Sequence, residues 1–195
     1  MLKKILLAAV VAATATFAQI NVGATLGANL STLKGDDAED IGTSIGFQAG
    51  VAGKFAVPVI PLVLVPEILI DMRNFSYDPG AEYNITTWAL DIPVMARFSP
   101  MPVFYIEAGP QFAFNLSTSS DKVLGKDISD IFEFNTFEFD FVLGGGTDIL
   151  PFVDIDFRVV LGLSDWMSGL VGEKGGDPWD TSNLQFMLGV TYWFL

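Results

Sequence analysis

Apolar and polar residues alternate strictly along the segment 20–30, INVGATLGANL, so that every second side chain of an extended chain is apolar. A period of two residues is the pattern of a β-strand with one apolar face. These eleven residues exceed the ~5–6 residues of a typical soluble strand and match the ~9–11 residues of a strand that crosses a bilayer at a tilt. The fold must therefore accommodate long strands with one apolar side.

The same alternation recurs along the chain and predicts eight strands, over 20–30, 44–55, 62–73, 86–98, 103–116, 137–147, 153–163 and 183–194. Three of the connections are short and contain proline, and four are longer and polar. Short turns at one rim and long loops at the other are typical of an up-and-down membrane barrel. We therefore predict an all-β fold, an eight-stranded antiparallel up-and-down transmembrane β-barrel. Both chain ends and the short turns would face the periplasm, and the long loops would face outside.

The N-terminus has the layout of a secretory signal. Two lysines precede a short apolar run over 5–13, and small residues follow at Thr16 and Ala18. The run is shorter than the ~20 residues that a membrane-spanning helix needs. We predict a signal peptide over 1–18 and an outer-membrane β-barrel domain over 19–195.

The apolar composition, without a second hydrophobic helix, narrows the choice of fold. The chain is 51% hydrophobic, but its most apolar later segment, 55–70, contains three prolines and Glu67, which disfavour a membrane helix. A transmembrane barrel and a soluble secreted β protein then remain. The face opposite the apolar rows is rich in small and amide residues with isolated charges of both signs, which suits a narrow, filled lumen. A secreted barrel that binds an apolar ligand is the alternative.

Aromatic residues near the strand ends predict two belts at the lipid–water interfaces. The belt at the turn rim comprises Phe55, Phe98, Phe104, Tyr192, Trp193 and Phe194, and the belt at the loop rim comprises Phe75, Tyr83, Trp88, Phe137 and Trp166.

Charge and composition exclude several functions. The chain has 10 basic and 23 acidic residues, a formal charge of −13, and neither His nor Cys. The acidic balance argues against nucleic-acid binding, which needs a basic face. Without His and Cys there are no Ser-His or Cys-His nucleophiles, no disulfides and no thiolate metal ligands. We therefore expect no enzymatic activity, no catalytic residues and no cofactor; a barrel enzyme acting on lipid or lipopolysaccharide through Glu138 or Asp140 is disfavoured by the lack of His.

Twelve charged side chains fall on the polar, inward face of the predicted strands. They are Lys54, Glu67, Asp71, Arg73, Asp91, Arg97, Glu107, Glu138, Asp140, Asp154, Asp156 and Arg158. Such groups could attract cations into a small channel or form a carboxylate pair for acid–base work. An eight-stranded lumen has little room for water or substrate, so we expect a salt-bridge network that plugs the barrel. Eight acids face four bases, so some carboxylates must lie near a rim, be protonated, or hold a cation.

Two further motifs are of types that can bind a ligand, but neither is predicted to do so here. Asp36, Asp37, Glu39 and Asp40 cluster in the first loop, and carboxylates suit calcium. Their spacing matches no calcium-loop signature, so a solvated acidic loop is favoured and no metal site is predicted. The three glycines at 144–146 lack the lysine and helix of a phosphate loop and indicate close packing or strand bending.

Several short motifs occur in a characteristic order and spacing. They are VPEIL at 65–69, LDIPV at 90–94, YIEAGP at 105–110, GGG at 144–146, DFR and LGL within 156–163, and LGVTYWF at 188–194. Together they resemble the outer membrane protein β-barrel domain family that includes PorT-like proteins, small barrels of the OmpA/OmpX type. The resemblance implies residence in the outer membrane of a Gram-negative-type envelope and no single shared activity. It implies outer-membrane lipid and the barrel assembly machinery as partners, and leaves any envelope protein partner open. A structural or interaction role follows as the leading hypothesis.

Overall fold

The structure is a computed structural model, which describes residues 20–34, 41–57, 60–77, 83–120, 132–150, 152–165, 167–170 and 182–194. The predicted signal peptide at 1–18 lies outside this part of the chain, as does the acidic cluster of the first loop, 36–40. Within the described ranges, no helix is long and apolar enough to cross a membrane.

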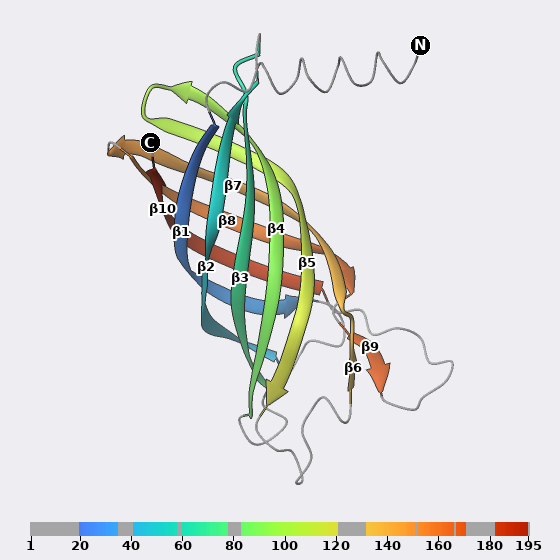
Figure 1. The fold of residues 1–195 in the computed structure, drawn as a ribbon. Coiled ribbons are helices and arrows are strands. Elements are labelled where there is room, and N and C mark those ends of the chain that lie inside the picture. The colour runs from blue at the N-terminus through green and yellow to red at the C-terminus, as the bar shows by residue number, and fades with distance from the viewer. Residues whose placement is uncertain are drawn as a thin grey trace, which may run out of the picture.

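Eight long strands close into one antiparallel barrel (Figure 1). They are β1 (Ile20–Lys34), β2 (Ile41–Ala56), β3 (Val63–Tyr77), β4 (Tyr83–Met101), β5 (Phe104–Ser120), β7 (Phe137–Leu150), β8 (Val153–Asp165) and β10 (Ser182–Phe194). Each strand pairs with the next along the chain, and β1 pairs with β10 to close the cylinder. The predicted eight-stranded antiparallel up-and-down barrel is confirmed.

The strands run further towards the loop rim than the alternation indicated. β1 continues to Lys34 rather than to residue 30, and β3 continues to Tyr77 rather than to residue 73. The added residues are mostly polar but remain in register with their neighbours, as in the pair Ser31 and Gln185. Main-chain hydrogen bonds sustain these extensions, and such bonds do not depend on an apolar face.

A second, small sheet forms where long loops were predicted. β6 (Phe132–Phe134) and β9 (Met167–Leu170) come from the third and fourth long connections and pair antiparallel. Figure 1 shows this ribbon beyond the loop rim, at the end of the barrel opposite the C-terminus. Strands of three and four residues are too short to display a clear period of two, so the sequence pattern did not reveal them.

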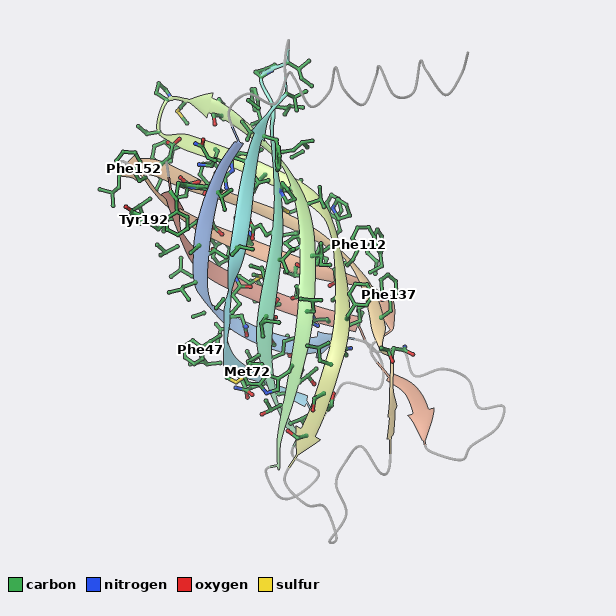
Figure 2. All side chains as sticks on the ribbon, in the orientation of Figure 1. Phe47, Met72, Phe112, Phe137, Phe152 and Tyr192 are labelled. Atoms are coloured by element: carbon green, nitrogen blue, oxygen red, sulfur yellow. The ribbon has the colours of Figure 1, made fainter. Side chains whose placement is uncertain are left out.

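The apolar rows face outwards. Leu26 and Leu188 are 66% and 58% exposed, whereas the polar Asn29 and Gln185 beside them on the same strands are almost fully buried. Figure 2 shows Phe47, among others, projecting away from the ribbon. A soluble carrier would turn these rows inwards around its ligand, so the secreted-carrier alternative is wrong.

Most of the predicted belt residues that the structure describes do lie on the outer face. At the turn rim Phe98, Phe104, Tyr192 and Phe194 are exposed, and nearer the loop rim Trp88 and Phe137 are exposed. Phe55 is half-buried. The side chain of Tyr83 and residue Trp166 lie outside the described part.

Two of the belt assignments are wrong. Phe75 is fully buried and Trp193 is 5% exposed, because each shares the inward row of its strand with polar residues. The indole of Trp193 lies against Gly23, where an added Cβ would come within 2.9 Å of the ring. The absence of a side chain at Gly23 therefore makes room for a large ring inside the barrel.

Candidate functional site

The twelve charged residues singled out from the sequence all lie on the inner face of the barrel. Eleven of them are at most 5% exposed, and the Lys54 side chain, near the turn rim, is 22% exposed. The structure divides them into two groups, one in each half of the lumen.

The turn-half cluster consists of Lys54, Arg97 and Arg158 with Glu67, Glu107, Asp154 and Asp156. Its centre is Arg158, whose two terminal nitrogens donate to the two oxygens of Glu67 at 2.8 and 2.7 Å. The Nε of Arg158 lies 2.7 Å from Glu107 and 2.9 Å from Asp156. Paired donation of this kind is the strongest geometry available to an arginine and a carboxylate. Arg158 thereby links three strands, β3, β5 and β8, across the lumen.

Arg97 and Lys54 complete the turn-half cluster. The Arg97 Nε donates to Glu107 at 3.0 Å, and its Nη1 donates to Asp154. The Lys54 ammonium lies 2.7 Å from the same oxygen of Asp154. The Arg97 guanidinium also lies 3.6 Å from the centre of the Tyr105 ring, a cation–π contact. Three bases thus serve four acids, and each acid contacts at least one base.

The loop-half cluster consists of Asp71, Arg73, Asp91, Glu138 and Asp140, so one base faces four acids. Arg73 contacts Asp71 at 3.0 Å, Asp91 at 2.8 Å and Glu138 at 3.2 Å. Asp140 receives a hydrogen bond from the Gln111 amide at 3.0 Å, and no ion pair to it is present among the described residues. All five charged side chains are fully buried.

Uncharged amides surround the loop-half carboxylates, and the sequence prediction did not include them. Asn29 and Gln185 donate to Asp71 at 2.7 and 2.8 Å. Asn115 donates to Glu138. The Gln111 amide donates to Asp140 and, at a longer distance, to Asp91. The alternation places these amides on the same polar, inward rows as the charges, but the predicted network was limited to charged residues.

Buried apolar side chains separate the two clusters along three of the strands, and we call them the apolar layer. Leu69 stands between Glu67 and Asp71 on β3, while Val142 and Val160 pair with each other on β7 and β8. All three apolar side chains are at most 1% exposed. No ion pair crosses this layer within the described part of the chain. The lumen therefore holds two separate charge networks.

The carboxylates of both clusters are buried, and arginine, lysine or amide donors bind most of their oxygens. No group of three or more acidic side chains in the described ranges is arranged to hold a metal ion. Removal of Arg158 would leave Glu67 and Asp156 without a base, and removal of Arg73 would leave the whole loop-half cluster without one, which is strongly unfavourable.

The model of one protein family matches most of this chain. The family is described as the outer membrane protein beta-barrel domain, and the match covers residues 17–168. The chain belongs to this family. With the outward apolar rows, the match places this barrel in the outer membrane of the cell. No curated protein sequence shows significant similarity to it.

Solved structures of other small outer-membrane barrels share the fold. Neisserial surface protein A superposes with a TM-score of 0.56 at 12% identity, over 89% of this chain and 97% of that one. Ail of Yersinia pestis, solved in complex with the heparin analogue sucrose octasulfate, gives 0.52 at 14% identity, over 90% and 99%. At these identities the similarity concerns the fold.

Proposed function

We propose that this outer-membrane barrel has a structural or interaction role in the cell envelope, with a lumen closed by its own side chains. One observation carries this proposal: two arginines bridge the lumen, each bound to carboxylates of three strands. Arg158 joins β3, β5 and β8, and Arg73 joins β3, β4 and β7. With an eight-stranded cylinder this narrow, such bridges leave no continuous path for a solute.

Conductance measurements test the closed lumen. Purified full-length protein inserted into planar lipid bilayers is expected to give no discrete current steps, while a porin reconstituted in parallel confirms that the assay detects a pore. Reproducible steps from this protein would contradict the proposal.

A small cation channel is the second candidate, favoured by the excess of lumen carboxylates over bases. Cation-selective steps that decrease when Asp91 and Asp140 are replaced by asparagine would establish it. Steps unaffected by these changes would arise from a path outside the loop-half cluster.

The long connections give the proposed outer surface a strong negative charge. The segments 35–40, 78–82, 121–131 and 171–181 contain twelve acidic and three basic residues, a net charge of −9. Such a surface repels sulfated polyanions of the kind bound by Ail and attracts cationic partners. We therefore propose a cationic envelope partner and no nucleic-acid ligand. The barrel is expected to pass through a heparin column and to bind a polylysine surface in low salt; retention on heparin would contradict this assignment.

Outer-membrane lipid and the barrel assembly machinery are the remaining proposed partners, and no enzymatic activity is proposed. A lipid-hydrolysis assay on the purified barrel is expected to show only background turnover. Turnover that disappears in Glu138→Gln or Asp140→Asn would instead reveal a catalytic carboxylate.

Protease treatment of intact cells tests the orientation of the barrel in the membrane, since cleavage should occur in the long loops.

A further inference from the structure

The two halves of the lumen differ in charge although both are buried. The turn-half cluster sets three bases against four acids, whereas the loop-half cluster sets Arg73 alone against four fully buried acids. Counted as ionised groups, the loop half carries three negative charges in excess. Uncompensated charge in a protein interior is costly, so positive charge must be supplied from outside the chain or as protons.

The loop half is also short of hydrogen-bond donors. The buried oxygens Asp140 Oδ1, Gln185 Oε1 and Asn115 Oδ1 have no hydrogen-bond partner in the described part of the chain. The amide nitrogens of Gln185 and Asn115 already donate to Asp71 and Glu138. These two hydrogen bonds fix the orientation of each amide group and leave its side-chain oxygen free to accept a hydrogen bond or to bind a cation. Gln185 and Asp140 are both fully buried.

The strand beside Asp140 carries no side chain at the paired position, and the neighbouring backbone packs closely there. Asp140 pairs with Gly162 on β8, and an added Cβ at Gly162 would lie 2.6 Å from the backbone nitrogen of Asn183 on β10. Asn183 is buried, and neither its side-chain oxygen nor its side-chain nitrogen has a partner among the described residues. Three adjacent strands thus present a carboxylate, a residue without a side chain and an amide at one level of the lumen.

We propose that the loop-half cluster binds one small monovalent cation, of the size of Na⁺, through Asp140 and neighbouring amide oxygens. Water would satisfy the free oxygens but would leave the excess charge unchanged, whereas one such cation satisfies them and reduces the excess from three negative charges to two. The absence of a group of three acidic side chains arranged for a metal ion, within the described ranges, argues against a divalent site made of carboxylates. One carboxylate with neutral amide oxygens supplies a single negative charge, which a singly charged ion balances.

Thermal unfolding of the full-length barrel in neutral detergent tests the site. The chloride salts of Na⁺ and of the bulky N-methylglucamine cation are compared at constant pH and ionic strength. A ligand that binds only the folded state raises stability in a saturable way. We expect the melting temperature to rise with Na⁺ by roughly 4 °C or more, and the ²³Na resonance to broaden in the presence of protein and sharpen when K⁺ competes.

Two asparagine variants localise the effect. Asp140→Asn should abolish both the Na⁺-dependent shift and the broadening. Asp154→Asn, in the turn-half cluster, should lower the melting temperature but retain the full Na⁺ response. Equal stability in the two salts with no ²³Na broadening would overturn the proposal and assign the compensation to protons. Loss of the response in both variants would also overturn it, because the effect would then not belong to the loop half.

Discussion

The two halves of the lumen use the same kinds of side chain but neutralise their carboxylates differently. In the turn half every acid contacts a base, as in the pairing of Glu67 with Arg158. In the loop half Arg73 is the single base, and amides such as Asn29 and Gln111 supply most of the other donors. The comparison teaches that a buried network can be largely hydrogen-bonded without being balanced in charge, because a neutral amide donates hydrogen bonds to a carboxylate but brings no positive charge.

The largest expected effect comes from removing each central arginine. Arg158→Met should cost about 3–5 kcal/mol, the usual penalty for breaking a buried ion pair. Arg73→Met should cost more, because the four carboxylates of the loop-half cluster then have no base at all. Urea unfolding in lipid vesicles, followed by tryptophan fluorescence, measures both. Ile68→Met on the lipid face is the matched control. An Arg73 variant more stable than the Arg158 variant would show that the negative charge of the loop half is already compensated.

Neutralising one carboxylate in each half should have a smaller and unequal effect. Glu67→Gln removes the charge that receives two bonds from Arg158 and should cost about 1.5–3 kcal/mol. Asp91→Asn also loses bonds to Arg73 but relieves repulsion among the loop-half acids, so its cost should be clearly lower. The same urea titration compares the two variants. Equal losses would mean that the loop half carries no excess charge.

The close approach of β5 to the β4 backbone can be tested at Gly109, which lies on β5 between Glu107 and Gln111. A Cβ at Gly109 would lie 2.0 Å from the Val94 carbonyl oxygen. Gly109→Ala should therefore cost about 1–3 kcal/mol, as overpacking usually does. Gly53→Ala is the control, because the three atoms nearest to its Cβ would all belong to the Phe55 ring, at 3.0 Å or more, and none to the backbone. If both alanine variants unfold at the same urea concentration, the close approach of the two strands does not require a glycine at position 109.

The smallest effect on the free energy of unfolding is expected for a substitution at the turn rim. Lys54→Met should cost less than about 1 kcal/mol, because the ammonium is partly solvated and Asp154 keeps its bond to Arg97. Urea unfolding at low and high salt provides the check. A loss similar to that of Arg158→Met would show that the rim is as strongly coupled as the centre.

Much of the fold follows from the period of two residues. Alternation located all eight barrel strands and assigned Asp71, Arg97 and Arg158 to the inward rows where the structure has them. It did not locate β6 and β9, whose few residues display no period. It also misplaced Phe75 and Trp193, since aromatic residues near a strand end were taken as lipid-facing although their parity points inwards.

The ion pairs and hydrogen bonds inside the lumen could not be predicted from the alternation. Arg158 binds Glu67 from 91 positions away along the chain, and Gln185 reaches Asp71 from 114 positions away. These contacts depend on the closing register of β1 against β10 and on the relative levels of the strands, which no local pattern encodes.

The sequence by itself determined that the chain forms long strands with an apolar side for lipid and a mixed side for the interior, because side-chain direction alternates with every residue. Only the tertiary structure decided that the interior splits into a nearly balanced half and a strongly negative half. Which base meets which acid depends on how the closed cylinder brings distant strands to the same level, and that geometry exists only once the barrel is closed.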